Sequence, residues 1–159
     1  IGGGDWSDYR LLPDCIKAWT KNKKVKIRNP KSTRPWQHVL DVLNGYICFG
    51  VELSTNKKLH GEAFNFGPTN NKNLRVIDIL NISKSIWPKI SWIIDNKKKF
   101  FENNLLQLNS NKSKKILKWK CILTSKESVQ MTIDWYKKFF QKKNVYELST
   151  NQIKNFIEK

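Results

Sequence analysis

The apolar residues of this chain repeat with helical spacing in several segments, and shorter segments of alternating residues separate them. The clearest helical segment follows Thr124, where Thr124 and Glu127 have the spacing of a capping box and an apolar stripe runs from Val129 to Phe140. Because side chains three and four residues apart share a helix face, this segment is predicted to bury one face. The same spacing predicts helices at 11–19, 39–51, 76–87, 112–118 and 150–157.

Short strands are predicted between these helices. Residues 25–28 alternate apolar and basic side chains before Asn29-Pro30, and residues 62–68 form a candidate strand that ends at Gly67-Pro68. Alternating helices and strands indicate an α/β fold, but the strands are too few for a complete doubly wound sheet. We therefore interpret residues 1–159 as a single partial domain. Further extended segments are predicted at 34–38, 90–94 and 105–109.

The predicted helix that begins at Val39 contains two glycines. Gly45 and Gly50 inside a helix each cost about 1 kcal/mol relative to alanine, so close backbone packing is the expected reason for them. The apolar positions of this helix trace one face, which consists of Val39, Leu43, Tyr46, Ile47 and Val51 together with Gly50.

Composition limits the class of protein. The 159 residues are 39% hydrophobic, which suits one globular domain with a core. No apolar run reaches the roughly 18–20 residues of a membrane span. Three widely spaced cysteines and two histidines argue against a disulfide framework or a structural zinc site and favour a cytoplasmic protein. Since the first residue is Ile1 and the one methionine is Met131, the chain is expected to be processed or partial.

The formal charge of +17 raises the possibility of a nucleic-acid-binding protein. Only four of the 30 basic residues are arginine, however, and the lysines are scattered in short runs along the whole chain. Arginine provides most bidentate phosphate and base recognition. The charge is therefore interpreted as solvated lysine surface, with attraction for smaller anions such as a nucleotide as the alternative. Neither a nucleic acid nor a membrane is expected as a partner.

Sequence motifs of common active sites are missing. Gly2-Gly3-Gly4 lacks the spacing of a dinucleotide-binding loop and has no strand before it, and the chain contains no Walker loop, GxSxG or HExxH. His38 and His60 have no second ligand nearby in the sequence, so no metal site is predicted. The informative segment is residues 27–39, where Arg28 and Arg34 flank a proline-bounded loop that is followed by Trp36.

A guanidinium projecting from a loop suits a diphosphate, which accepts planar bidentate hydrogen bonds. Trp36 fits either a stacking surface or, more commonly for a tryptophan between proline and an apolar helix, the core. On residues alone this segment predicts a phosphate-ester site.

Several motifs resemble the CDP-glucose 4,6-dehydratase family of extended short-chain dehydrogenases/reductases. They are Gly2-Gly3-Gly4-Asp5-Trp6, Arg10-Leu11-Leu12-Pro13-Asp14, Ile27-Arg28-Asn29-Pro30, Arg34-Pro35-Trp36-Gln37-His38-Val39 and Asn65-Phe66-Gly67-Pro68. The resemblance implies the C-terminal, substrate-binding part of a Rossmann-type fold. The family's NAD-binding loop, Tyr-x-x-x-Lys pair and acid/base carboxylates would lie in a missing N-terminal part.

In this family, NAD oxidises C4 of the sugar, water is eliminated across C5–C6, and the hydride returns to C6. The resemblance therefore implies CDP-glucose as the substrate and NAD as the cofactor of the intact enzyme, in deoxysugar and O-antigen biosynthesis. It implies partnership with the N-terminal half and a possible homodimer. The chain alone is expected to bind no cofactor, to have no catalytic residues and to be inactive.

The resemblance also assigns substrate-binding residues. Arg34 matches the arginine that reaches the diphosphate, Ile27 and Arg28 match the strand along the nucleobase, and Arg10 and Leu11 match the helix that borders the nucleotide. Asn65 matches an asparagine near the phosphates, with a backbone-capping role as the alternative. Lys99 falls where relatives carry a phosphate-binding arginine, although its segment otherwise departs from the family pattern.

Two other interpretations remain. The chain could be a non-catalytic fragment that holds a nucleotide sugar, or part of a related dTDP- or UDP-sugar dehydratase or epimerase. In either case the predicted strand at 63–66 would lack sheet neighbours, because in the intact fold they come from the other half. An unpaired apolar edge of this kind predicts loose packing or poor solubility.

Overall fold

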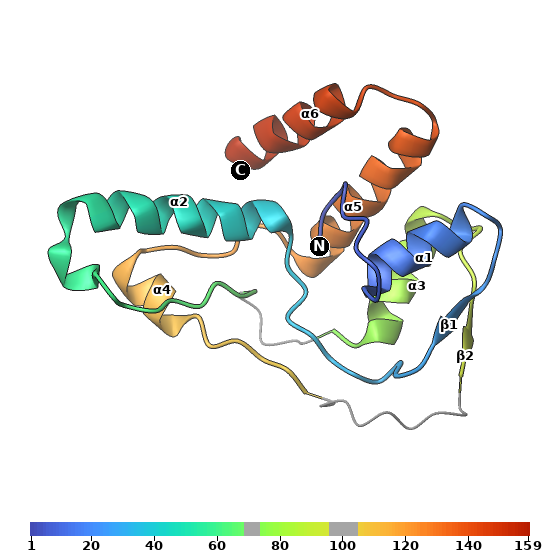
Figure 1. The fold of residues 1–159 in the computed structure, drawn as a ribbon, viewed down its shortest axis with the longest axis horizontal. Coiled ribbons are helices and arrows are strands. Elements are labelled where there is room, and N and C mark those ends of the chain that lie inside the picture. The colour runs from blue at the N-terminus through green and yellow to red at the C-terminus, as the bar shows by residue number, and fades with distance from the viewer. Residues whose placement is uncertain (69–73, 96–104) are drawn as a thin grey trace.

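The computed structural model describes residues 1–68, 74–95 and 105–159. Its main body consists of three helices and a pair of parallel strands (Figure 1). Their bounds are α1 Leu11–Trp19, β1 Val25–Ile27, α3 Val76–Ile86, β2 Trp92–Ile94 and α5 Ser125–Phe140. The two strands pair in parallel with Val25 opposite Trp92 and Ile27 opposite Ile94. The predicted α/β class is therefore confirmed.

One hydrophobic core holds this body together. The predicted stripe of α5 contributes Val129, Ile133 and Tyr136, all fully buried, and α3 contributes Ile79 and Leu80. The remaining buried members are Leu12, Cys15, Ile16, Trp19, Ile27, Ile90 and Trp135. The capping box that the sequence predicts is present, since Thr124 and Glu127 each bind the other's backbone amide.

A projecting arm extends from the main body (Figure 1). It consists of α2 (Val39–Thr55), the short helix η1 (Lys57–Leu59), residues 61–67, α4 (Asn111–Ile116) and residues 117–123. Its own buried cluster is small: Leu59, Leu117 and Trp119. Half-buried residues of α2, including Phe49 and Leu53, pack against that cluster. The arm therefore encloses a much smaller core than the body.

Gly45 has the close packing that the sequence predicts, because a Cβ there would lie 2.4 Å from Cδ1 of Phe66. The same prediction is wrong for Gly50, which has nothing within 4 Å of a Cβ position. Gly50 lies on the exposed side of α2, among the predicted apolar face, and that face remains open to solvent.

The predicted strand at 62–68 is wrong: the structure assigns no strand there. Side chains of the α4 region take its backbone hydrogen bonds in place of a neighbouring strand. The Oγ of Ser110 accepts from the amide of Gly67 at 2.9 Å, and the Nζ of Lys112 donates to the carbonyl of Ala63 at 3.0 Å. Ser113 likewise donates to the carbonyl of Asn65. The extended segments predicted at 34–38 and 105–109 also form no assigned strand.

The last helix, α6 (Val145–Ile157), begins five residues before the predicted start. Asn144 caps it by accepting from the amides of Tyr146 and Glu147, a helix-start signal that the sequence contained. The helix packs on α5, where Trp135 donates to Ser149 and Gln152 donates to the carbonyl of Met131. Among the described residues, no helix is long and apolar enough to cross a membrane.

Candidate functional site

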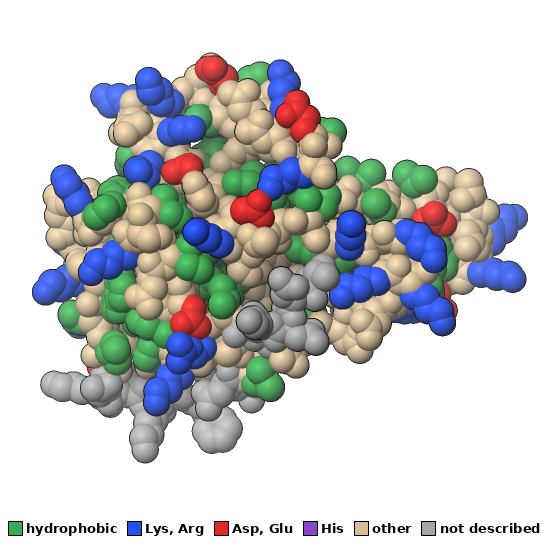
Figure 2. Space-filling view, turned by 180° about the vertical axis from the view of Figure 1, so that it is seen from behind, with side chains coloured by type: hydrophobic (Ala, Val, Ile, Leu, Met, Phe, Trp, Pro, Cys, Tyr) green, Lys and Arg blue, Asp and Glu red, His purple; other side chains and the backbone are tan. Residues whose placement is uncertain are grey.

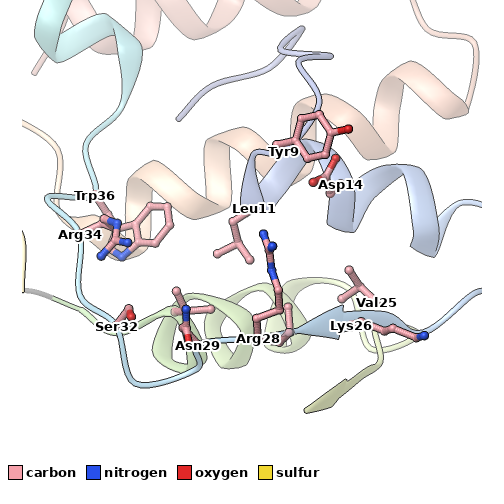
Figure 3. A pocket seen from close by; sticks show the side chains of 12 residues that line it. Tyr9, Leu11, Asp14, Val25, Lys26, Arg28, Asn29, Ser32, Arg34 and Trp36 are labelled. Carbon is pink, nitrogen blue, oxygen red and sulfur yellow. The ribbon is translucent and has the colours of Figure 1, made fainter. Parts of the chain in front are cut away.

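A cavity of about 240 Å³ opens between β1, the start of α1 and the loop that follows β1 (Figure 3). Arg28, the residue after β1, extends its guanidinium toward α1, and Lys26 points away along the strand (Figure 3). The cavity is lined by Tyr9, Leu11, Asp14, Val25, Lys26, Ile27, Arg28, Asn29, Ser32, Arg34, Trp36 and Val76.

The loop from Asn29 to Trp36 is fixed by backbone hydrogen bonds. The amide of Ser32 donates to the carbonyl of Asn29 at 3.2 Å, which closes the turn after Pro30. The first two amides of α3 then bind this turn: Val76 donates to Ser32 at 2.9 Å and Ile77 to Pro30 at 3.0 Å. The first amides of a helix have no partner within the helix. In α3 they bind the loop instead, and they thereby anchor the loop that carries Arg34.

Arg34 and Trp36 form one side of the cavity. The Nη1 of Arg34 donates to the carbonyl of Thr33 at 2.8 Å, so the half-buried guanidinium is oriented before any ligand binds. The indole of Trp36 donates to the carbonyl of Leu74 at 2.8 Å and packs against the main core. Trp36 thus combines the two roles that the sequence left open: it is anchored in the core and its ring lines a cavity.

A second cavity, of about 350 Å³, lies on the N-terminal side of the same wall. It shares Leu11, Arg34 and Trp36 with the first cavity. Its remaining lining residues are Ile1, Gly2, Asp5, Arg10, Leu12 and Pro13. Arg34 is therefore the one charged side chain among the three residues that line both cavities.

Cationic side chains outnumber carboxylates in both cavities. The first cavity is lined by Lys26, Arg28 and Arg34 and by one carboxylate, that of Asp14; the second is lined by Arg10 and Arg34 and by Asp5. Partial burial raises the pKa of Asp5, but hydrogen bonds from Ser7 and the charge of Arg10 outweigh it, so the pKa of Asp5 is lowered. Asp5 therefore remains ionised at neutral pH, and the excess of cationic over anionic side chains still favours an anionic ligand.

The structure brings five of the seven predicted site residues together. Leu11, Ile27, Arg28 and Arg34 line the first cavity, and Arg10 lines the second. Asn65 lines neither; its amide nitrogen lies 3.5 Å from the carbonyl of Asn109, a backbone contact of the kind proposed as its alternative role. Lys99 lies outside the described residues.

Sequence reasoning missed several lining residues. Ser32 lies inside the proline-bounded loop between Arg28 and Arg34, and Asp5 lies inside the glycine-rich motif. Both could therefore have been predicted as lining residues from the sequence. Tyr9 had no such signal: it is 93% exposed, has a φ of +63° and lines the first cavity.

His38 has a structural role next to this site. It is 1% exposed, and its Nδ1 accepts from the amide of Leu40 at 3.3 Å at the start of α2. Burial lowers the pKa of His38 to about 4, so the ring is neutral at physiological pH. Within the described ranges, no group of three or more histidine, cysteine or carboxylate side chains could hold a metal ion.

The glycine motif does not form a phosphate-binding loop. A Cβ at Gly3 would lie 2.1 Å from the indole Cγ of Trp135, so the ring of α5 fills the space above the backbone. The strand β1 ends at Ile27 and leads into the loop that contains Pro30, whereas a dinucleotide site needs a strand followed by a glycine-rich turn and a helix. These residues do not fit an NAD site.

Comparison with known proteins places this geometry in context. No family model matches the chain. A CDP-glucose 4,6-dehydratase from Salmonella typhimurium (strain LT2) is 33% identical over 158 residues, which cover 99% of this chain and 44% of that protein. The chain thus spans less than half the length of the curated relative it matches.

Solved structures show the same fold. The UDP-glucuronic acid 4-epimerase from Bacillus cereus, in complex with UDP-glucuronic acid and NAD, superposes with a TM-score of 0.73 at 18% identity and covers 87% of this chain and 43% of that one. RMD from Pseudomonas aeruginosa, complexed with NADPH, has a TM-score of 0.66 at 16% identity over 87% of this chain and 45% of that one. The resemblance predicted from the motifs, and the assignment to part of a Rossmann-type fold, are confirmed.

Proposed function

We propose, from the premise that this chain corresponds to part of a CDP-glucose 4,6-dehydratase, that it forms the wall of a nucleotide-sugar pocket. The position of Arg34 supports this proposal most directly, because this residue lines both cavities. A nucleotide sugar consists of two bulky parts joined by a diphosphate. Two cavities that share a lining arginine suit a ligand with its anionic diphosphate between two larger parts.

The ligand has a preferred direction in this pocket. The first cavity, with Ile27 and Arg28 from β1 and the aromatic ring of Trp36, offers an apolar wall with cationic donors to a nucleobase and ribose. The second cavity, with Asp5 and Arg10, offers hydrogen-bonding groups to a hexose. The diphosphate then lies at Arg34, where bidentate hydrogen bonds are strongest.

The chemistry of the family enzyme needs NAD, which accepts a hydride from C4 of the sugar and returns it to C6. Since the described residues do not fit a dinucleotide, the proposed role of this chain is to bind and orient the substrate. NAD and the acid/base groups belong to the rest of the enzyme. The 159-residue chain, given CDP-glucose and NAD, is expected to form no 4-keto-6-deoxy sugar.

Titration calorimetry of the 159-residue chain with CDP-glucose tests the proposal. Arg34→Ala is expected to weaken binding by about 1.5–3 kcal/mol, the range for hydrogen bonds to charged groups. Arg75→Ala is the matched control, because Arg75 pairs with Asp78 and lines neither cavity. Equal affinity of the Arg34→Ala variant and the unaltered chain would contradict the proposal.

The choice of nucleotide is tested with the same protein. UDP-glucose and dTDP-glucose are the competing ligands, since the related epimerases in the comparison carry UDP-sugars. Tighter binding of CDP-glucose supports a CDP-sugar enzyme. Tighter binding of UDP- or dTDP-glucose would assign the chain to one of the related branches instead. A cytoplasmic location, a homodimer and a role in O-antigen synthesis remain predictions.

A further inference from the structure

Part of the wall of the second cavity has no helix or strand of its own. Residues 2–9, the segment that precedes α1, form only turns and irregular structure. Gly2 and Asp5 of this segment nevertheless line the second cavity, and Arg10 follows it directly. The segment crosses α5 before it enters α1 (Figure 1). Contacts with these two helices therefore decide where the wall lies.

Three aromatic rings of α5 hold Trp6. They belong to Tyr136, Phe139 and Phe140, whose spacing places them on one side of the helix. The ring centroid of Trp6 lies 5.2 Å from that of Tyr136 and 5.1 Å from that of Phe139, and Phe140 lies at 6.1 Å. Two of the three pairs meet nearly edge to face, at 79° and 89°, which is a favourable arrangement. Trp6 is still 39% exposed, so these ring contacts fix its place.

A hydrogen bond from α5 reaches the cavity wall itself. The hydroxyl of Tyr136, a fully buried residue, donates to the backbone carbonyl of Asp5. Burial and the charge of Asp5 raise the pKa of Tyr136 to about 12, so the hydroxyl keeps its proton at neutral pH. The Oδ1 of Asp5 accepts in turn from the amide of Ser7 at 3.0 Å. The orientation of the Asp5 carboxylate thus depends on the turn that Tyr136 holds.

Two further contacts fix the same segment. The backbone at Gly3 rests on the ring of Trp135, since a Cβ there would lie 2.1 Å from the indole Cγ. From α1, the Nζ of Lys17 donates to the carbonyl of Trp6 at 2.8 Å. The aromatic residues of α5 line neither cavity. Helix α5 therefore acts on the second cavity through residues 2–9.

We infer that Tyr136 is a positioning residue for the sugar end of the pocket, because it holds Asp5 and Trp6 in place. The inference rests on the proposed function, which places the hexose in the second cavity. Hydrogen bonds require donor–acceptor distances of about 2.7–3.2 Å, so a small shift of Asp5 costs affinity for the sugar. The diphosphate at Arg34 lies on a different loop and is unaffected by that shift.

Titration calorimetry of the 159-residue chain with CDP-glucose and with CDP tests this inference. Y136F deletes the hydroxyl and keeps the ring. It is expected to weaken the binding of CDP-glucose about fivefold, and that of CDP by less than about twofold. The matched control is S128A, because Ser128 on α5 is also buried, donates to the carbonyl of Thr124 at 2.9 Å and lines neither cavity. S128A is expected to change neither affinity.

General attraction between the basic chain and an anion does not distort this comparison. Lysine and arginine side chains lie scattered over the face of the molecule that Figure 2 shows. Their attraction is the same in every variant and cancels when a variant is compared with the unaltered chain. Equal losses for CDP and CDP-glucose in Y136F would overturn the inference, because a general loosening of the fold affects both ligands. So would an unchanged affinity for CDP-glucose, or an equal loss in S128A.

Variants of Trp6 provide an independent check. W6A removes the ring that α5 holds and is expected to weaken the binding of CDP-glucose more than that of CDP. W6F keeps an aromatic ring and is expected to restore most of the loss. Thermal unfolding verifies that each variant is folded at the temperature of the titration. Failure of W6F to bind CDP-glucose better than W6A would contradict the role of the ring contacts.

Hydrogen exchange separates this inference from the proposed function, because it needs no ligand. The amide of Ser7 is expected to exchange faster in Y136F than in S128A or in the unaltered chain. A chain that binds no CDP-glucose but shows this faster exchange would refute the proposed function and leave Tyr136 as the residue that holds Asp5. Unchanged exchange at Ser7 would overturn the inference even where CDP-glucose binds.

Discussion

The main body and the projecting arm follow the same rules of local structure, but they differ in how completely they bury their apolar residues. The body packs α5 against α3 and α6, and Ile133 and Tyr136 are fully buried in its core. The arm buries one side of α2 and leaves Ile47 two-thirds exposed on the other. The difference teaches that a regular helix with a strong apolar pattern is not evidence of a completed core.

The largest expected effect tests the body against the arm. Ile133→Ala removes a fully buried side chain from the main core and is expected to lower the free energy of unfolding by about 2–5 kcal/mol. Leu59→Ala in the arm's cluster is the matched control and is expected to cost less, because the small cluster can collapse around the gap. Urea unfolding of both variants measures the two costs.

If Leu59→Ala costs as much as Ile133→Ala, the arm is as well packed as the body. The contrast between the two regions would then be wrong.

A contact within the arm, between α2 and residues 117–123, gives a smaller effect. Asp41 in the first turn of α2 accepts from the amide of Ile122 at 2.7 Å and from that of Leu123 at 3.3 Å. Asp41→Ala leaves both amides without their acceptor and is expected to cost about 1.5–3 kcal/mol. Hydrogen exchange, read residue by residue, is expected to rise in α2 and at 119–123 before it rises in α5.

Uniform acceleration of exchange throughout the chain would contradict this expectation. It would show that arm and body unfold as one cooperative unit.

The smallest effect concerns the capping box of α5 and its pH dependence. A hydrogen bond from Lys159, followed by those from Thr124, lowers the pKa of Glu127 to about 2. A folded-state pKa below the unfolded value gives stability that is present above about pH 4.5 and is lost as the pH falls toward 2. Glu127→Gln is expected to remove that part of the acid dependence, as thermal unfolding between pH 2 and 6 would show.

Thr124→Ala is the companion variant and is expected to cost about 1 kcal/mol near neutral pH, the usual loss for an N-cap. An acid profile that is identical in Glu127→Gln and the unaltered chain would exclude the capping carboxylate as its source. Both effects belong to the body, so neither variant is expected to change hydrogen exchange in α2.

The sequence predicted well the elements that are stabilised locally. Thr124 and Glu127 specify the start of α5 by themselves, and the spacing of Ile79, Leu80 and Ser83 specifies the buried face of α3. The loop after β1 was also within reach, because Pro30 and the two arginines lie within a few residues of one another. These features depend on residues that are close together in the sequence, so the local sequence pattern is enough to predict them.

The errors concern features that depend on distant residues. Residues 62–68 have the composition of a strand, yet Ser110 and Lys112 take up the backbone hydrogen bonds that a neighbouring strand would have made. Both Gly45 and Gly50 were expected to pack closely because glycine inside a helix is costly, but Phe66 contacts only the Gly45 position. Tyr9 lines the site and has a positive φ, and nothing in the neighbouring sequence indicates that backbone conformation.

The absence of lysine and arginine from α2 has a practical consequence for peptide mapping. No lysine or arginine lies between Arg34 and Lys57, and Arg34 is followed by proline, where trypsin does not cut. Digestion therefore releases the whole helix in a single peptide that begins after Lys31. Chemical labelling of Tyr46 can then be read from one mass-spectrometric signal, with the protein bound or free.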